Sequence, residues 1–122
     1  MSVLNKLLIG LFLMSIFECS TNSQDISFIY PENLQIKQYT DNSFYLVIHN
    51  TSNDTLIIEA INTSCNCILA DKNLPSVIHP KKNDSIKFTL KSNKIGERTE
   101  NVVIVHNFKN RFKSLKINYE VH

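Results

Sequence analysis

Two cysteines one residue apart are the best candidates for chemistry in this chain. Cys65 and Cys67 lie in the stretch TSCNCIL, and the third cysteine is Cys19. Thiols at this spacing can form a disulfide, hold a soft metal ion such as Cu(I), or pack as small apolar side chains. On a regular strand their Cβ atoms would be farther apart than the roughly 3.8 Å of a disulfide, so that bond requires a bend. The sequence leaves all three alternatives open.

The histidines are weaker candidates for a site. Structural zinc would need two ligands besides the cysteines, taken from His49, His79, His106 or His122. The same His49, His79 and His106 are the candidate auxiliary ligands if Cys65 and Cys67 bind copper. His49 and His106 each end an apolar run before an asparagine, so they would lie close together if those two strands pair. Histidines at strand ends more often act as polar caps than as catalysts.

No sequence motif indicates an enzyme. The chain has no glycine-rich phosphate loop, no nucleophile elbow and no HExxH segment. An active site would therefore have to be built from residues that carry no motif. We expect a protein without enzymatic activity.

Apolar residues that recur with a period of two predict β-strands. These strands would position the two cysteines. The alternation runs through SFYLVIHN, DSIKFTLKS and SLKINYEV, as expected of strands with one buried face. The run NVVIVHN is continuously apolar, which favours a strand covered on both faces. Turn-forming residues separate these runs at short intervals. About seven short strands in roughly 100 residues predict an all-β, immunoglobulin-like antiparallel β-sandwich.

The first 18 residues have the features of an export signal. Lys6 precedes an apolar run from Leu7 to Phe17, which is shorter than the roughly 20 residues of a membrane span. Cys19 then occupies the position of the lipidated cysteine in bacterial lipoproteins, although Phe17 and Glu18 are larger than the residues usual before it. We therefore expect a signal peptide over residues 1–18, a polar tether over 19–25 and the sandwich domain over 26–122. The alternative for Cys19 is a free or disulfide-bonded thiol.

The order of landmarks along the chain resembles DUF1573, a bacterial family of domains of unknown function. They are Phe44 to Asn50, Leu56, Ile58, Ser64 to Cys67, Ile78 to Pro80, Ile86, Phe88, Gly96 and Val105 to Asn107. The resemblance covers about residues 35–122, and its sharpest element is the Cys-x-Cys motif. It implies an exported, often lipid-anchored domain with a hydin-like immunoglobulin fold, but no established activity.

Three positions depart from the pattern of that family. Asn66 and Lys81 stand where the family usually has glycine, and the final strand of the family often carries glycine near the position of Tyr119. Because asparagine tolerates a positive φ angle, Asn66 can keep the backbone shape that glycine would give, and a left-handed Asn66 would provide the bend for a disulfide. Lysine tolerates it less well, so we expect the positive φ of the turn after Pro80 to move to Asn83.

The charge of the chain excludes a nucleic-acid binder. The formal net charge is +2, whereas a nucleic-acid binder clusters many cations to neutralise phosphates. The clearest basic cluster is Lys109, Arg111, Lys113 and Lys116, with Lys81 and Lys82 on another turn. It could contact an acidic partner or lipid head groups, but alternating charges on a strand more often form a solvated face.

The leading interpretation is a non-enzymatic module in the envelope of a bacterium. It would be anchored to a membrane through lipidated Cys19 and would bind an envelope protein or component through loops or a sheet edge. The first alternative is a copper-binding or thiol-redox domain that uses Cys65 and Cys67. The second, a periplasmic chaperone, rests on analogy of fold alone.

Overall fold

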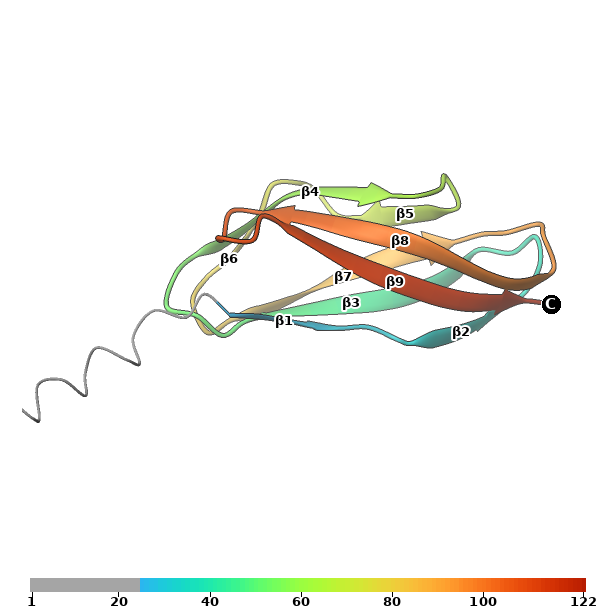
Figure 1. Ribbon diagram of the computed structural model, residues 1–122, viewed down its shortest axis with the longest axis horizontal. Helices are drawn as coiled ribbons and strands as arrows, with labels where there is room; N and C mark the ends of the chain where they lie inside the picture. The colour runs from blue at the N-terminus through green and yellow to red at the C-terminus, as the bar shows by residue number, and fades with distance from the viewer. Residues whose placement is uncertain (1–24) are drawn as a thin grey trace, which may run out of the picture.

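The computed structural model describes residues 25–122, and these form two packed β-sheets (Figure 1). The leader and Cys19 lie outside the described residues, so the predictions for them stay predictions. Nine strands follow one another along the chain: β1 (Ile26–Ile29), β2 (Asn33–Ile36), β3 (Asn42–Asn50), β4 (Leu56–Thr63), β5 (Ile68–Asp71), β6 (Ser76–Ile78), β7 (Asn83–Leu90), β8 (Gly96–His106) and β9 (Phe112–Val121). Among these residues no helix is long and apolar enough to span a bilayer.

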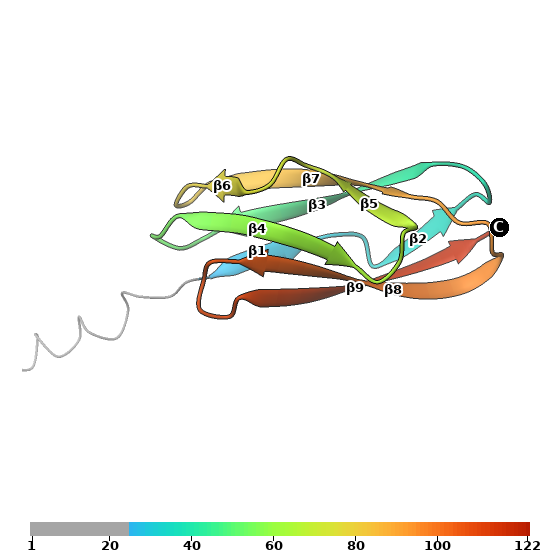
Figure 2. The same ribbon diagram turned by 90° about the horizontal axis from the view of Figure 1, so that it is seen from above.

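The two sheets have the order of an immunoglobulin-like sandwich. The first sheet has the order β1-β3-β7-β5 and the second β2-β9-β8-β4-β6. All pairs are antiparallel except β2 with β9, which is parallel. The predicted fold class is therefore confirmed. There are nine strands instead of about seven because the chain along each side of the sandwich is divided into two short strands that belong to different sheets (Figure 2). On one side these are β1 and β2, and on the other β5 and β6.

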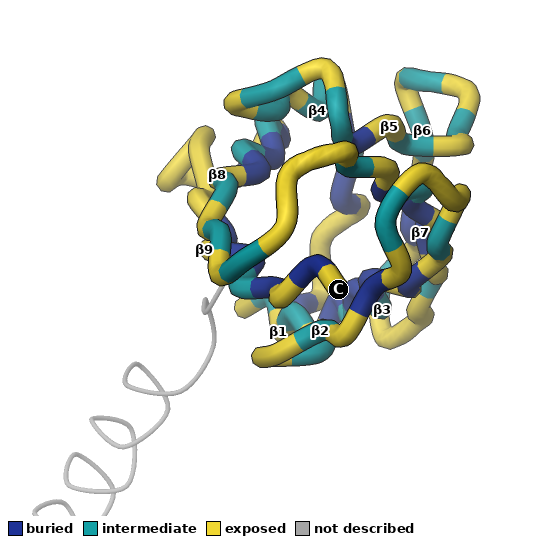
Figure 3. Tube along the Cα trace, turned by 90° about the vertical axis from the view of Figure 1, so that its right-hand side faces the viewer, coloured by how far each residue is buried: buried dark blue, intermediate teal, exposed yellow. Residues whose placement is uncertain are grey.

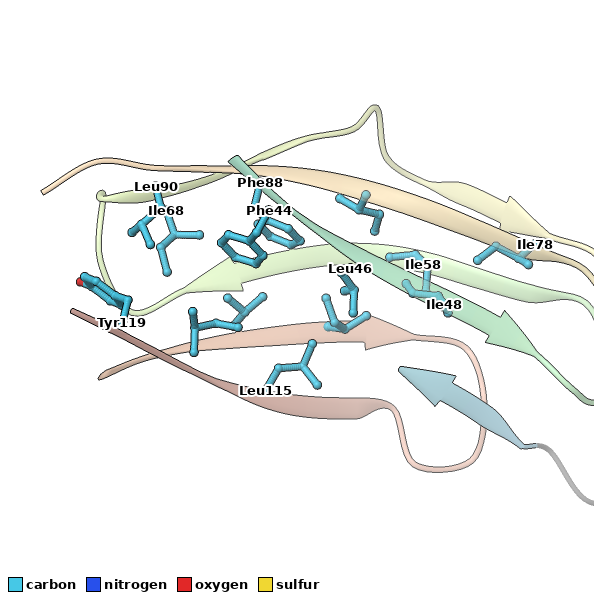
Figure 4. Packing of buried hydrophobic residues seen from close by; sticks show 14 of the residues in the cluster. Phe44, Leu46, Ile48, Ile58, Ile68, Ile78, Phe88, Leu90, Leu115 and Tyr119 are labelled. Atoms are coloured by element: carbon cyan, nitrogen blue, oxygen red, sulfur yellow. The ribbon is translucent and has the colours of Figure 1, made fainter. Parts of the chain in front are cut away.

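The core lies between the sheets and is built from the alternating residues. On β3, Phe44, Leu46 and Ile48 are buried, and Phe88 of β7 stacks on Phe44 with ring centroids 5.1 Å apart (Figure 4). The burial of β8 alternates as well, although its sequence is continuously apolar. The valines at 103 and 105 are half-buried, so the expectation that both faces of this strand are covered is wrong. A two-layer sandwich leaves the outer face of each sheet to the solvent.

Every connection from β1 to β8 crosses from one sheet to the other, and three of these crossovers lie between β4 and β7. β4 belongs to the second sheet, β5 to the first, β6 to the second and β7 to the first. The loop between Thr63 of β4 and Ile68 of β5 is the first of these crossovers, and it carries both cysteines of the Cys-x-Cys motif. The motif therefore lies at a corner of the sandwich, where the chain leaves one layer for the other.

The turn between β6 and β7 corrects another prediction. Lys81 itself adopts a positive φ of 64°, and Asn83 does not have a positive φ. The amide of Lys82 donates to the carbonyl of His79 across this turn, at 3.1 Å. Pro80 and Lys81 are thus the central residues of a type II turn, whose second central position requires a positive φ whichever residue occupies it.

The sandwich has two ends with different sets of loops (Figures 1 and 2). The start of β1 lies at one end with the β3–β4 loop, the β6–β7 turn and the β8–β9 hairpin. We call this the N-terminal end. The C-terminus lies at the other end with the β2–β3 and β7–β8 loops, and the β4–β5 loop with its two cysteines points toward it. We call this the C-terminal end.

Candidate functional site

Cys65 and Cys67 form a disulfide at the C-terminal end. Their Cα atoms are 5.2 Å apart. The Thr63 hydroxyl donates to the carbonyl of Cys65 at 2.8 Å, and the amide of Lys91, after β7, donates to the carbonyl of Cys67 at 2.9 Å. The pair is therefore fixed to both sheets. Of the three alternatives for these cysteines, the structure has the disulfide.

The bend that allows this bond does not come from a positive φ at Asn66. Among the described residues, positive φ angles occur at Tyr39, Lys81 and Gly96. Asn66 thus does not adopt the left-handed conformation that would have provided the bend. A turn with negative φ angles also brings the first and third residues closer than a strand does, so the left-handed conformation is not needed. Residues 64–67 form such a turn between β4 and β5.

Tyr119 and Glu100 lie beside the disulfide. The hydroxyl of Tyr119, on β9, is 3.8 Å from Sγ of Cys67 and donates to Oε2 of Glu100 at 3.3 Å. The other carboxylate oxygen accepts from the hydroxyl of Ser64 at 2.8 Å. Burial, followed by the charge of Glu100, raises the pKa of Tyr119, while Arg98 opposes that rise. The phenol is thus held neutral and remains a hydrogen-bond donor.

A hollow of about 480 Å³ opens beside the disulfide. It is lined by Tyr39, Cys65, Asn66, Cys67, Lys91, Ser92, Asn93, Lys94, Arg98, Glu100 and Tyr119. Three of these side chains are cationic and one is anionic, so the hollow favours an acidic ligand. Most of the loop residues around it are exposed (Figure 3).

One large exposed side chain lines the hollow, and a second follows the lining residue Lys94 in the sequence. Tyr39 is 67% exposed, and Ile95 of the β7–β8 loop is 68% exposed. Tyr39 also has a φ of 62°, which is costly for a bulky residue. Its loop is held in place, because the amide of Tyr39 donates to the carbonyl of Ser92 at 3.0 Å and the Gln38 side chain donates to Asn93 at 2.8 Å.

The candidate histidine ligands do not gather at the disulfide. The group that could hold a metal among residues 25–122 consists of Cys65, Cys67 and Glu100, whose ligand atoms lie within 4.8 Å of one another. His49 is on β3 and His106 on β8, and these strands belong to different sheets and do not pair. His79 is exposed in the β6–β7 turn. The expected proximity of His49 to His106 through strand pairing is therefore wrong.

The contacts of His106 give it a structural role. It is buried, and its Nδ1 accepts a hydrogen bond from the amide of Phe108 at 3.1 Å. Burial lowers the pKa of His106, and the charge of Arg111 lowers it further against the opposing effect of Glu59. A neutral imidazole is what this acceptor role requires.

Glu100, Tyr119 and Tyr39 were not among the predicted site residues. Glu100 reaches the cysteines because β4 pairs with β8, which places Thr63 opposite Val102. Tyr119 reaches them because β8 pairs with β9 and places Glu100 opposite Ile117. Both pairings join segments far apart in the sequence, and no motif marks either residue. The alternation did identify Tyr119 as a core position.

Comparison with known protein families identifies the family of this chain. The fold and the Cys-x-Cys corner define a small immunoglobulin-like domain. The chain belongs to the family described as protein of unknown function (DUF1573), whose model matches residues 32–121. The resemblance seen in the sequence is therefore confirmed. A search of curated proteins finds no significant match.

Solved structures share the fold at low sequence identity. The secreted serine protease VesC from Vibrio cholerae aligns with a TM-score of 0.65 and 9% identity, over 81% of this chain and 23% of that one. A protein of unknown function from Porphyromonas gingivalis W83 gives 0.61 and 14%, over 85% and 50%. The ASH / PapD-like domain of human CEP192 gives 0.60 and 5%, over 82% and 85%. The chain thus spans half or less of the first two proteins, and the likeness concerns the fold alone.

Proposed function

We propose that this protein is a non-enzymatic, exported immunoglobulin-like module that binds another protein of the cell envelope through its C-terminal end. Lipidation of Cys19 would anchor the opposite end to a membrane. The observation that carries the proposal is Tyr39, which is exposed on the rim of the hollow and held in a left-handed conformation. A costly backbone conformation that exposes an aromatic side chain contributes little to folding and is typical of functional loops.

The chemistry of the C-terminal end supports a protein partner. Tyrosine and arginine are enriched among the residues that dominate protein interfaces, and Tyr39 and Arg98 both line the hollow. Ile95 adds apolar area beside them. The excess of cations around the hollow favours an acidic segment of the partner. The disulfide would keep the floor of this surface in one conformation, which lowers the entropic cost of binding.

The test is chemical crosslinking in cells that produce the full-length chain. We expect a crosslinked complex with an envelope protein, and we expect Tyr39→Ala to reduce its yield at least tenfold, as for a residue that dominates an interface. Tyr45→Ala is the matched control, because Tyr45 is 55% exposed on β3 outside the hollow. Equal losses in both variants, or a chain that forms no complex, would contradict the proposal.

The edges of the sheets are less suited to a chaperone that binds by strand addition. The outermost strands β1, β5, β2 and β6 have three or four residues each. The open edge beside β2, residues 112–117 of β9, carries exposed Lys113 and Lys116, and lysines on an edge oppose strand addition. A chaperone of that kind presents a longer edge with pockets for alternate side chains of the added strand. We therefore rank the chaperone alternative below binding through the C-terminal loops.

A second candidate function is thiol-disulfide exchange at the same corner. Its support is that the half-buried disulfide lines the hollow, with the Glu100 carboxylate within reach as a proton acceptor for a thiol. In the reduced state the two thiols could instead bind Cu(I), a soft ion that accepts few ligands. Titration of the reduced chain with Cu(I) tests the copper alternative, which fails if uptake is unchanged when Cys65→Ser and Cys67→Ser are combined.

A further inference from the structure

The β8–β9 hairpin at the N-terminal end presents an aromatic side chain among cations. Phe112 is 67% exposed at the start of β9, and Lys109, Arg111 and Lys113 lie on either side of it in the sequence. These residues line a hollow of about 660 Å³, which also includes Asp25 and Ile26 at the start of the described chain. The hairpin thus lies beside the point where the tether enters the domain (Figure 1).

Two cations of the hairpin, Arg111 and Lys113, make weak surface contacts. Arg111 pairs with Glu59 at 3.0 Å, but both side chains are at least a third exposed, so this ion pair adds little to stability. The Nζ atom of Lys113 lies 5.9 Å from the centre of the Phe28 ring. Both side chains can therefore turn toward an external anion at small cost.

The neighbouring turn adds to the positive charge. Lys81 and Lys82 lie on the β6–β7 turn at the same end, and Nζ of Lys81 donates to the carbonyl of Thr51 at 2.7 Å. The hairpin, the β3–β4 loop and the β6–β7 turn, with Asp25 and Glu59 beside them, carry five cationic side chains and three carboxylates, namely Lys81, Lys82, Lys109, Arg111, Lys113, Asp25, Asp54 and Glu59. Asp84, at the start of β7, is paired with Lys72. The surface therefore has a net attraction for anions, around one exposed aromatic ring.

We propose that this N-terminal end docks on a membrane rich in anionic phospholipids, with Phe112 at the level of the head groups. Exposed aromatic residues flanked by lysine and arginine match the membrane interface, where each cation near an anionic leaflet contributes about 1 kcal/mol. The proposal rests on the proposed anchoring. A tether from Cys19 to Asp25 spans at most about 20 Å, which keeps this end at the bilayer and raises its effective concentration there.

Docking at this end determines the orientation of the whole domain. The two ends lie at opposite limits of its long axis, so a membrane-bound hairpin directs the C-terminal end away from the lipid (Figures 1 and 2). The hollow beside the disulfide then faces the surrounding envelope instead of lying against the membrane. A weak lipid contact would thus present the partner-binding surface in one direction.

The test uses tryptophan fluorescence, because the natural chain has no tryptophan. Phe112→Trp places a single reporter on the hairpin, and Ile95→Trp places one of matched exposure, 68%, at the other end. Both are introduced into residues 19–122 with Cys19→Ser, so that no acyl chain contributes to binding. This chain retains every buried hydrophobic residue, from Ile36 to Val121, and therefore its complete core.

Vesicles containing phosphatidylglycerol should shift the emission of the Phe112→Trp protein to the blue, and brominated lipid should quench it. Neither effect is expected for Ile95→Trp or with vesicles of phosphatidylcholine alone. Adding Lys82→Gln or Lys113→Gln should weaken binding about fivefold each, the equivalent of about 1 kcal/mol per cation. No blue shift at position 112, or equal shifts at 112 and 95, would overturn the proposal.

Other outcomes separate this proposal from the function on which it rests. If the lysine substitutions reduce crosslinks to a protein in cells and leave vesicle binding unchanged, the surface binds an acidic protein and the membrane proposal is wrong. Mass spectrometry of the mature N-terminus tests the lipidation of Cys19 independently of vesicle binding. The crosslinking test at Tyr39 likewise concerns only the opposite end.

Discussion

Asn50 is a buried polar side chain that joins two segments at the N-terminal end. It is only 1% exposed, and its amide group donates to the carbonyls of Asp54 at 2.7 Å and Ile78 at 3.0 Å. Its oxygen accepts from the hydroxyl of Ser52 at 2.6 Å. The side chain thus links the β3–β4 loop to the end of β6. Because these groups are buried, losing their partner costs more than losing an exposed contact.

Replacing this side chain should therefore lower stability considerably. We expect Asn50→Ala to reduce the free energy of unfolding by about 2 to 3 kcal/mol, since buried carbonyls lose their donor. Urea denaturation of the two proteins measures the difference. Asn53→Ala, at an exposed position of the same loop, should cost less than about 0.5 kcal/mol. A loss below about 1 kcal/mol for Asn50→Ala would show that the loops do not depend on this network.

His106 should make the stability of the domain depend on pH. Its pKa is lowered in the folded state, so between that value and the ordinary 6.5 the unfolded chain binds more protons. The free energy of unfolding therefore keeps its full value, as far as His106 is concerned, above about pH 6.5. It decreases as the pH falls through that value toward the folded pKa. In His106→Asn the side-chain oxygen can still accept from the Phe108 amide but cannot titrate.

Urea denaturation at several values of pH tests this interpretation. We expect the wild-type protein to lose more stability than His106→Asn as the pH is lowered from about 7 to about 5. His79→Asn, at an exposed position, is the control for the substitution itself. Parallel profiles for wild type and His106→Asn would mean that His106 titrates alike in both states.

At the residue scale the sequence predicted the chemistry only in part. Cys65 and Cys67 were identified by their spacing. The φ angle of Asn66 could not be, because it depends on the contacts that the β4–β5 turn makes with the rest of the fold. The need for a positive φ after Pro80 was recognised from the family pattern. It was assigned to Asn83 because lysine is unfavourable there, whereas the turn type fixes it at Lys81.

At the scale of elements, the β4–β5 corner should be stabilised little by its disulfide. The bond closes a loop with a sequence separation of only 2. Since the restriction of the unfolded chain grows with loop length, removing it should cost only about 1.5 kcal/mol. We expect Cys65→Ser combined with Cys67→Ser to remain folded and to lose about that amount in urea denaturation. A loss above about 4 kcal/mol would assign the disulfide a larger role in folding.

The long strands could be predicted from the sequence, whereas the short ones could not. β3, β7 and β9 contain enough alternating residues to show one buried face. β5 and β6 have four and three residues, which is too few for a pattern to appear. Their assignment to opposite sheets depends on pairing with β7 and β4. The position of Glu100 beside the cysteines depends on such long-range pairing as well.

At the scale of the whole molecule, the two ends differ in a way that suits an anchored module. The N-terminal end carries the start of the described chain, the basic hairpin and Phe112. The C-terminal end carries the disulfide, the exposed Tyr39 and a hollow lined by three cations. The proposed function requires that these ends meet different partners in the cell. The outer faces of the sheets, where Tyr45 lies, would then have no specific contact.

Photo-crosslinking from single positions in living cells is the most direct test of this arrangement. A photoreactive amino acid would replace Tyr39, Tyr45 or Phe112 in the full-length chain, one position at a time. We expect a discrete protein adduct from position 39, lipid adducts from position 112 and neither from position 45. Protein adducts of the same mass from positions 39 and 45, or no protein adduct from position 39, would contradict it.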